Sequence, residues 1–564
     1  MNAAFIFIFG IIFLFLGFIV YGKHIRAKLF PLSESKPTPA NTMTDGVDYV
    51  PAKPLVLFGH HFASIAGAGP IVGPLVAVGA WGWLPVLLWV LLGSVFMGGV
   101  HDYLALMISV RNGGISIAEA AEKAISKRAR WLFSVFVWLS LVLVVAVFAV
   151  VTAKTLLEQP EIVIPTIGLI PLAMIFGYLN YKTKLPLGLN TVIALALLIL
   201  MLYLGSIYPI PLKGQILSVS AFTFTFVLLL IYALFASILP VWILLQPRDY
   251  LSVWILFAGL FAGAIGLIVA HPNINAPMFS GFTGSQQGAM WPMLFVIVAC
   301  GAISGFHSLV ASGTTSKQLA SEKQGLTIGY GGMLLEGALA LVALFSVSAG
   351  LVWASSTTSN MGINFKTLIS TKGWIVTFAT GFGEITSHLP FISRKAGKLF
   401  GMLMLNGFVL TTLDTATRLG RFLFTEIVTG GSPQSKRGVW YSNRWFASFV
   451  GIVFAYLLGS TNSWQSIWPV FGSANQLVAA LALIVATSYL FGVRKPSLYS
   501  AIPGAFMLIT TIGALVYKSI DFANKGNIML VLVADILIIL SILVLLETIK
   551  FFKQRRAELS EADR

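Results

Sequence analysis

Long runs of apolar residues, separated by short polar connections, extend along almost the whole chain. Fifteen of these runs are long enough for a helix to cross the hydrocarbon core of a bilayer, which takes about 20 residues. They cover residues 3–21, 54–78, 82–110, 131–153, 162–180, 187–208, 219–245, 249–270, 290–311, 327–351, 396–417, 445–461, 464–491, 498–517 and 527–549. The pattern therefore predicts an all-α polytopic membrane protein with about fifteen transmembrane helices.

One further apolar stretch, residues 372–392, is interrupted by glycines, a glutamate, a histidine and a proline. If this stretch crossed the membrane, twelve later lysines and arginines would move to the outer side. Cytoplasmic loops carry an excess of these residues, so we predict that the stretch does not span. The N-terminus is then expected outside and the C-terminus in the cytoplasm.

The run at residues 54–78 carries the clearest irregularity in the sequence. Residues 67–74 contain three glycines and two prolines, which free the backbone to unwind and remove hydrogen-bond donors. Within hydrocarbon, such a break is tolerated only where protein or a water-filled cavity satisfies the freed backbone groups, as at the substrate sites of secondary transporters. The chain is therefore expected to be a transporter.

The order of the runs predicts a repeated core. Apart from the first helix, ten runs lie between residues 54 and 417, and because each half has five runs, the two halves must be inverted in the membrane. The sixth of the ten, residues 219–245, is then expected to be broken like the first, and it carries Pro240. We predict three parts: residues 1–50 as an N-terminal helix and loop, 51–430 as a five-plus-five inverted-repeat core with discontinuous first and sixth helices, and 431–564 as peripheral helices with a cytoplasmic tail.

Composition agrees with a membrane protein and excludes several other classes. Of 564 residues, 57% are hydrophobic and only 10% are charged, and the mean hydropathy is +0.90. The net charge of +16 follows from cations in cytoplasmic loops, so we expect membrane lipids and no nucleic acid as partners. A single cysteine, Cys300, forms no intrachain disulfide or cysteine metal cluster. Motifs for ATP binding, metalloproteases and serine hydrolases are missing from the sequence, so we expect neither an enzyme nor a cofactor.

Six motifs spread over most of the chain resemble the carbon starvation protein A family. They are GHHFASIAGAGPIVGP at residues 59–74, GGVHDY at 98–103, SVRNGG at 109–114, SILPVWILLQPRDY at 237–250, IGYG at 328–331 and TTLDTATR at 411–418. The resemblance implies a bacterial or archaeal inner-membrane transporter that takes up peptides, or in some members pyruvate, with proton coupling in the pyruvate group. It also implies the leucine-transporter-type fold of the amino-acid, polyamine and organocation superfamily, which is a five-plus-five inverted repeat.

Together these observations predict ion-gradient-driven uptake of peptides by alternating access. A proton-coupled symporter of pyruvate or a small monocarboxylate is the alternative, and a channel is an alternative of another class. Either a proton or sodium is expected as the coupling ion.

A substrate site is expected beside the two predicted breaks. The N–H groups that follow the first break lie at the positive end of a helix dipole and favour a carboxylate, although a packing kink would show the same residues. His60 and His61 point about 100° apart on a helix, and we favour His61 as a substrate contact. The predicted substrate-binding residues are His61, Ser64, Gly67, Ala68, Gly69, Ser237, Pro240 and His307.

Ionisable residues at membrane depth are candidates for coupling, because burying a charge in hydrocarbon is costly. Asp102 and Glu336 are such residues, whereas Asp414 and Arg418 are expected to form an i,i+4 pair that stabilises their own helix. Hydroxyls near the end of the eighth core run suit sodium, although they also bond back to carbonyls of their own helix. The predicted coupling residues are Asp102, Ser312, Thr314, Thr315 and Glu336, and no metal other than sodium is expected.

Overall fold

A computed structural model describes ten stretches of the chain, and almost all of their regular structure is helical. The described residues are 1–32, 37–46, 48–183, 185–216, 218–240, 243–284, 287–353, 363–430, 440–461 and 464–562. Two short antiparallel hairpins, β1 (Gln215–Ile216) with β2 (Val219–Ser220) and β3 (Thr283–Gly284) with β4 (Gly288–Ala289), are the strands that these residues contain.

The helices fall on either side of the connection that follows α12. Those of the first part are α1 (Ala3–Leu16), α2 (Lys23–Leu29), α3 (Pro39–Thr42), α4 (Pro54–Ile65), α5 (Gly69–Trp81), α6 (Trp83–Gly93), α7 (Gly99–Arg111), α8 (Ile117–Ala124), α9 (Lys127–Glu158), α10 (Val163–Lys182), α11 (Leu187–Ile207) and α12 (Ala221–Ile238). Those of the second part are α13 (Leu245–Ala270), α14 (Met290–Ile297), α15 (Gly305–Gly313), α16 (Gly331–Ser348), α17 (Phe365–Thr371), α18 (Gly373–Thr386), α19 (Arg394–Thr429), α20 (Arg444–Thr461), α21 (Trp464–Gly492), α22 (Leu498–Asn524) and α23 (Ile528–Ala562).

Short π-helical and 3-10 segments connect or extend several of these helices. The π-helical segments are η1 (Gly17–Gly22), η2 (Ser94–Gly98) and η6 (Leu326–Tyr330), and the 3-10 segments are η3 (Pro160–Ile162), η4 (Thr315–Lys317), η5 (Glu322–Gln324) and η8 (Trp440–Ser442). Through η1, η2 and η6 the helix pairs α1–α2 and α6–α7 and the lead into α16 each form one continuous span.

Thirteen helices in the described residues are long and apolar enough to cross a membrane, and the pair α4–α5, bent by 44°, makes a fourteenth. These fourteen correspond to fourteen of the fifteen predicted runs. The break between α4 and α5 falls at residues 66–68, where the glycines and Pro70 predicted it. The chain is therefore a multi-pass helical membrane protein, as the apolar pattern indicated.

The remaining run, residues 290–311, is not a continuous helix. It is divided into α14 and α15 by the non-helical residues 298–304. α15 begins against α21: a side chain on Gly305 would lie 2.6 Å from the backbone nitrogen of Ala479, so only glycine permits this approach. The second broken helix of the chain is therefore α14–α15.

The predicted break in the run 219–245 is wrong. α12 continues without interruption to Ile238, and Pro240 is exposed in the connection that leads to α13. Leu239 has the extended conformation (φ −61°, ψ 148°) that a residue before proline prefers, which ends the helix instead of kinking it. The sequence therefore placed an irregularity at the right proline, but this proline follows the end of a helix and does not break one.

The interrupted stretch 372–392 forms α18, which has 14 residues and spans only about 21 Å. This is shorter than the roughly 30 Å of hydrocarbon in a bilayer, and α18 is not among the candidate spans. It packs against α19, α16 and α13. Its length agrees with the prediction that this stretch does not cross.

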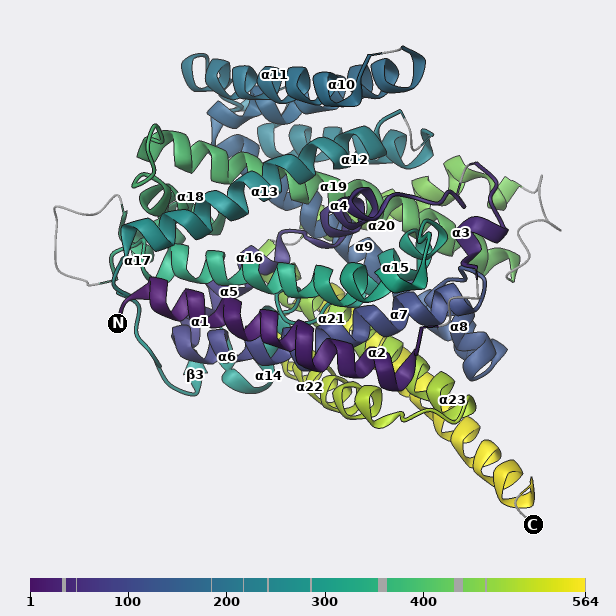
Figure 1. Ribbon diagram of the computed structural model, residues 1–564. Coiled ribbons are helices and arrows are strands. Elements are labelled where there is room, and N and C mark those ends of the chain that lie inside the picture. The colour runs from purple at the N-terminus through teal and green to yellow at the C-terminus, as the bar shows by residue number, and fades with distance from the viewer. Residues whose placement is uncertain are drawn as a thin grey trace.

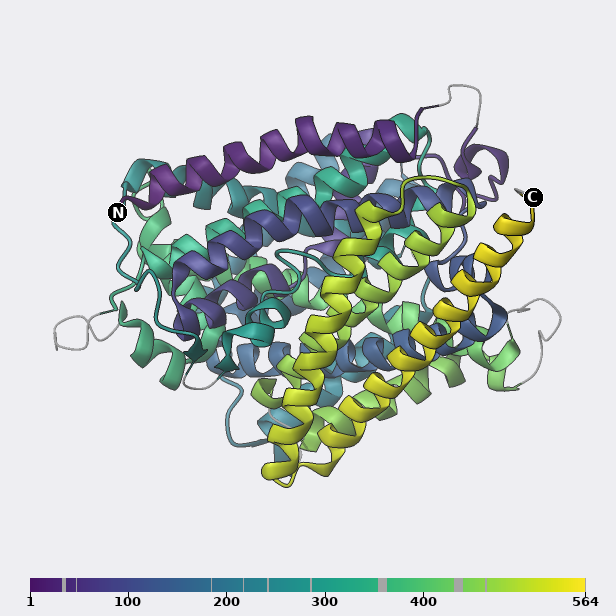
Figure 2. The same cartoon turned by 90° about the horizontal axis from the view of Figure 1, so that it is seen from below.

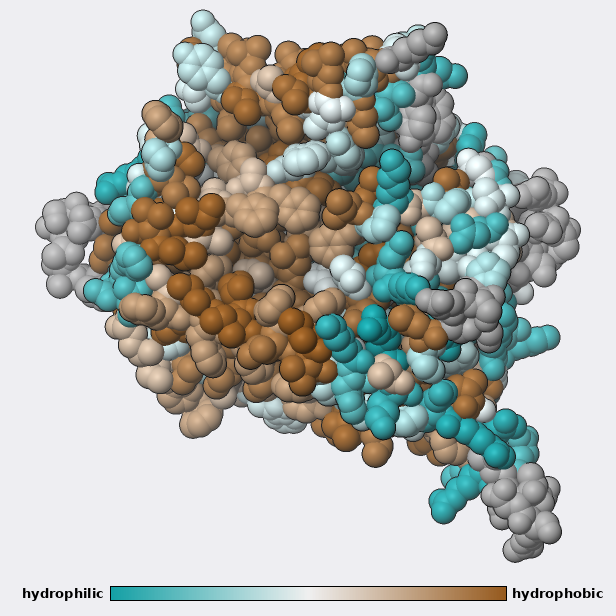
Figure 3. All heavy atoms as spheres, in the orientation of Figure 1, coloured by the Kyte–Doolittle hydropathy of each residue, from teal (hydrophilic) through white to brown (hydrophobic). Residues whose placement is uncertain are grey.

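The spans run roughly in one direction across the molecule, with the two chain ends at opposite ends of it (Figure 1). The pair α10–α11 lies on one side, and α22 and α23 lie together on another (Figures 1 and 2). Apolar side chains cover much of the visible face, whereas hydrophilic ones gather toward the end that holds the C-terminus (Figure 3). This distribution is typical of a bilayer-embedded surface with one polar end.

We expect reporter fusions to confirm the sidedness. Reporters placed after Gly430 and after Pro496 should both read cytoplasmic, because an even number of crossings separates these two positions. A reporter inserted after Pro277 should read external. An external signal after Gly430 would show that α18 crosses the membrane and would contradict this topology.

Candidate functional site

The two helix breaks meet in the interior of the protein. A side chain on Gly69, at the start of α5, would lie 2.6 Å from the Cβ of Cys300, in the break between α14 and α15. Likewise, a side chain on Gly73 would lie 3.0 Å from the Cα of Val298, and one on Gly301 would lie 3.6 Å from the Cα of Pro70. These glycines let the first turns of α5 approach the unwound segment 298–304 closely.

Two side chains of α21 satisfy backbone groups that the second break frees. The carbonyl oxygen of Asn475 accepts from the N–H of Phe306 at 2.9 Å, and its amide donates to Ser304 Oγ at 3.0 Å. Gln476 Nε2 donates to the carbonyl of Phe295 at 3.0 Å. Free backbone groups are costly at membrane depth, so α21 holds this break in place. Neither residue could be singled out from the sequence, because polar side chains on one helix do not reveal which break they face.

Beside the two breaks lies a buried cluster of acids and histidines from three spans. Nδ1 of His307, on α15, is 2.7 Å from Asp102 on α7, and its Nε2 is 2.9 Å from Glu336 on α16. The second carboxylate oxygen of Asp102 is 2.7 Å from Nδ1 of His101. All four side chains are at most 1% exposed. The structure thus brings together Asp102, Glu336 and His307, which the sequence had singled out separately.

The charge of this acid–histidine cluster depends on how many protons it holds. With both carboxylates ionised and only His307 protonated, it carries one net negative charge. Burying an uncompensated charge is strongly unfavourable, so one further proton on a carboxylate or on His101 stabilises it. Two carboxylates bridged by one imidazole can therefore take up or release a proton in response to a change in their surroundings.

The adjacent histidines on α4 face different surroundings, as their helical spacing predicted. His61 is fully buried, its Nδ1 is 2.8 Å from Thr315 Oγ1, and its ring lies against Gly332 of α16. His60 and Ser64 instead line a cavity. His61 therefore does not face the cavity, and His60 is the histidine that a ligand there would meet.

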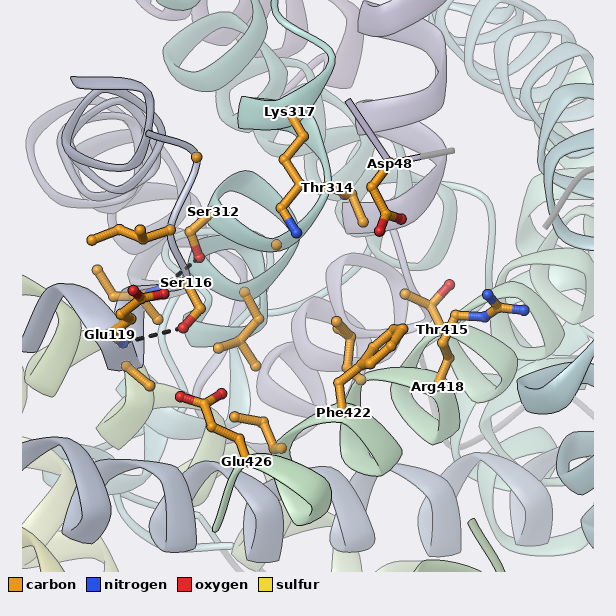
Figure 4. A pocket seen from close by; sticks show the side chains of 18 of the residues that line it. Asp48, Ser116, Glu119, Ser312, Thr314, Lys317, Thr415, Arg418, Phe422 and Glu426 are labelled. Atoms are coloured by element: carbon orange, nitrogen blue, oxygen red, sulfur yellow. Dashed lines mark hydrogen bonds between the residues drawn. The ribbon is translucent and has the colours of Figure 1, made fainter. Parts of the chain in front are cut away.

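This cavity has a volume of about 1180 Å³ and lies near the polar end of the molecule, between α4, α8, α15 and α19 (Figure 4). Figure 4 shows side chains from several of these elements directed into one space. Its charged lining residues carry both signs: Arg130, Lys317, Arg418, Arg421 and Arg444 against Asp48, Glu119, Asp249 and Glu426. At its edge, burial raises the pKa of the Tyr49 phenol, and nearby Glu119 and Asp48 raise it further.

The hydroxyls expected to bind sodium form hydrogen bonds within the protein. Ser312 and Thr314 line the cavity, but each bonds back to the carbonyl four residues earlier, at 2.6 and 2.9 Å, while Thr315 contacts His61. This is the alternative interpretation that the sequence had left open.

Several predicted substrate contacts lie away from the cavity. Ser237 Oγ is 2.9 Å from Ser448 Oγ of α20, so Ser237 joins two helices and does not lie across a cavity from Gly67. Gly67, Ala68 and Gly69 are buried at the break, beyond the last cavity-lining residue of α4, Ser64. The cavity therefore reaches the final turn before the break but not the break itself.

A second buried charged group links α12, α13 and α19. Asp414 contacts Arg248 and accepts a hydrogen bond from Tyr232 at 2.7 Å. Arg418 donates to the carbonyls of Ala236 and Leu239 at the end of α12. The expected i,i+4 pair of Asp414 with Arg418 is therefore wrong, because Arg248 reaches Asp414 from another helix.

Many membrane-spanning helices, two broken helices in contact and buried ionisable residues beside a polar cavity define a polytopic membrane transporter. The chain belongs to the family described as carbon starvation protein CstA, which matches residues 2–362 and 349–514.

Curated relatives bear transporter names. The peptide transporter CstA of Campylobacter jejuni is 32% identical over 91% of this chain and 79% of its own length, and that of Bacillus subtilis is 33% identical over 90% and 89%. The pyruvate/proton symporter BtsT of Escherichia coli is 32% identical over 88% of this chain and 79% of its own. The crystal structure of a manganese transporter from Eremococcus coleocola aligns with 93% of this chain and 99% of its own chain, at 12% identity and a TM-score of 0.49.

We expect Gly69→Ala to destabilise the protein. Alanine favours a helix over glycine by roughly 1 kcal/mol, but the added methyl group meets Cys300, and overpacking of this kind costs about 1–3 kcal/mol. Gly451→Ala in α20 is a matched control, because a side chain there meets nothing within 4 Å. Melting temperatures of the purified variants should fall for Gly69→Ala only. Equal melting temperatures for the two variants would contradict the close contact between the breaks.

Proposed function

We propose that this protein is a secondary active transporter that takes up peptides by alternating access, driven by a proton gradient, in the inner membrane of the cell. The observation that carries the proposal is the position of α4 and α15 between the cavity and the acid–histidine cluster. α4 presents His60 and Ser64 to the cavity and His61 to the opposite side, and α15 presents Ser312 to the cavity and His307 to the cluster.

This position supplies a route for coupling. A substrate that contacts the cavity side of α4 and α15 changes how these helices pack, and His307 moves with α15 relative to Asp102 and Glu336. Because these contacts decide how many protons the cluster holds most stably, substrate binding and proton binding affect each other by the same free energy.

Peptides fit the charge pattern of the cavity. A peptide carries an ammonium and a carboxylate at its two ends, and the lining offers carboxylates and guanidinium groups from different elements. Pyruvate carries only a carboxylate and needs no acidic lining. The peptide-transporter names of relatives from Campylobacter jejuni and Bacillus subtilis support the same choice, while the name of the Escherichia coli symporter supports pyruvate and proton coupling as the alternative.

We also propose a five-plus-five inverted repeat, in which the helices assigned to each half differ from those expected from the sequence. The first half is α4–α5, α6–α7, α9, α12 and α13, and the second is α14–α15, α16, α19, α20 and α21. The hairpin α10–α11 is then an insertion. With each broken helix counted as one crossing, an even number of crossings lies between the two members of every pair, so the members run in opposite directions.

Matching neighbours support this pairing of helices. α13 packs on the broken helix of the first half through α4, and α21 packs on that of the second half through α15. α5 packs on α16, and α15 packs on α7. α9 and α19 pack on each other, and both α12 and α20 pack on the two of them. The short helices α8 and α17–α18 follow the second member of each half.

Sodium is the second candidate for the coupling ion, and one observation favours it. Thr412 Oγ1 of α19 is buried without a hydrogen-bond partner among the described residues, and a side chain on Gly67 would lie 3.1 Å from it. A hydroxyl beside the C-terminal end of α4 suits a hard cation, because that end carries the negative pole of the helix dipole.

Uptake into proteoliposomes tests the proposed function. Labelled Ala-Ala, Ala-Ala-Ala and pyruvate are offered with an inward proton gradient and, separately, an inward sodium gradient. We expect a peptide to accumulate above its external concentration with the proton gradient and to leak out after an uncoupler is added. Accumulation with the sodium gradient alone would show that sodium, and not the proton, is the coupling ion. Flux that only dissipates gradients would indicate a channel.

Removing the charge of Glu336 should uncouple transport. We expect Glu336→Gln and Asp102→Asn to lower accumulation under a proton gradient to the level seen without a gradient, because the cluster can no longer exchange its proton. Exchange of preloaded for external substrate should continue, since it needs no net proton movement. Glu558→Gln, a 62% exposed residue of the cytoplasmic tail, is the control and should behave as wild type. Unchanged gradient-driven accumulation in Glu336→Gln would reject this assignment.

A further inference from the structure

Arg248 of α13 combines full burial with an unused hydrogen-bonding edge. Its side chain is 0% exposed. Nη1 contacts Asp414 and Tyr232, but Nε and Nη2 have no hydrogen-bond partner among the described residues. A buried guanidinium with two unsatisfied nitrogens is costly, so this edge calls for an acceptor that the described residues do not provide.

The geometry of the free edge specifies the acceptor. Nε–H and one Nη2–H of a guanidinium point in the same direction, at the spacing of the two oxygens of a carboxylate. Because Nη1 is occupied by Asp414, the edge that remains is the one that binds a carboxylate through two parallel hydrogen bonds. A neutral carbonyl oxygen satisfies only one of these donors well.

The nearest carboxylate does not fill this position. Asp249 Oδ1 is 3.6 Å from Nη2, which is beyond a hydrogen bond, and this oxygen also lacks a partner among the described residues. Asp249 itself lines the cavity, as do Thr415 and Arg418 of α19. The free edge of Arg248 is therefore one side chain away from the cavity, behind Asp249.

We propose that Arg248 binds the carboxylate of the transported substrate. The substrate enters from the cavity and accepts from Nε and Nη2, while Asp249 turns toward the cavity that it already lines. Asp414 and Tyr232 hold Nη1 and keep the guanidinium in place, so they are positioning residues. This inference rests on the proposed function, since peptides and pyruvate both carry a carboxylate, and it assigns the carboxylate to α13 and not to the N–H groups after Gly67.

Binding of acid and amide forms of the same probe tests this subsite. Dissociation constants are measured on purified full-length protein for Ala-Ala, its C-terminal amide, pyruvate and pyruvamide. In wild type, we expect at least one of the two acids to bind, and to bind at least roughly tenfold more tightly than its amide. This is the size of effect that one charge-assisted hydrogen-bonded pair supplies. Arg248→Gln should bring this ratio close to one.

Two further variants keep the test decisive if Arg248→Gln fails to fold. Arg248→Lys retains the charge but lacks the two-donor edge, so the ratio should fall to an intermediate value. Asp249→Asn removes the competing carboxylate, so the acid form should bind more tightly than to wild type. Arg128→Gln, whose side chain is 64% exposed and pairs with Glu547 outside the cavity lining, should leave the ratio unchanged.

Each failure has a separate meaning. A large ratio in wild type that persists in Arg248→Gln or Arg248→Lys would overturn the subsite and leave the proposed function intact. So would an Asp249→Asn variant that binds the acid no more tightly than wild type. If wild type binds neither Ala-Ala nor pyruvate, the proposed function fails and the subsite fails with it.

Discussion

The structure depends on one constraint: inside a bilayer, water is not available to satisfy a free backbone group or an isolated charge. Several irregular features in the described part of the chain are accordingly paired with one another. The break after α4 lies against the break before α15, and Asn475 and Gln476 of α21 bond the ends of the second break. The carboxylates of Asp102 and Glu336 lie against His307, and that of Asp414 lies against Arg248. Such pairing concentrates the polar groups of the membrane interior in a few places, which is where transport chemistry is expected.

His307 is the point at which the broken helix and the acids are joined. It contacts Asp102 and Glu336 from α15, the half-helix that also borders the cavity. If two helices joined by an ion pair move apart, the number of protons that the pair holds most stably changes. Such a pair therefore has two states that differ in bound protons. In the proposed mechanism, this arrangement links the packing of α15 to protonation without requiring a substrate to touch either acid.

Much of this architecture was predictable from the sequence, for identifiable reasons. Length and hydropathy located fourteen spans, and the glycines with Pro70 located the first break, because these residues act on their own backbone. The same local reasoning failed at Pro240, since a proline that ends a helix and one that kinks it look alike in sequence. It also missed the break in residues 290–311, where the decisive fact is the close approach of α21 to Gly305.

Among candidate site residues, charge at membrane depth singled out Asp102 and Glu336, and both are fully buried. Sequence could not show that they share His307, because these contacts join three helices. His101, next to Asp102 on α7, completes the cluster. Asp414 was assigned to Arg418 by spacing within a helix, yet Arg248 from another helix lies closer. Choosing between His60 and His61 required knowing which face of α4 borders the cavity.

The proposed coupling requires substrate binding to change the number of protons that the acid–histidine cluster holds. The most direct test is to add saturating Ala-Ala or pyruvate to purified protein in weakly buffered solution and to measure the protons exchanged per substrate bound. We expect a clear proton exchange in wild type that disappears in Glu336→Gln, while the variant still binds the substrate. Substrate binding by wild type without any proton exchange, from mildly acidic to mildly alkaline pH, would contradict the proposed coupling.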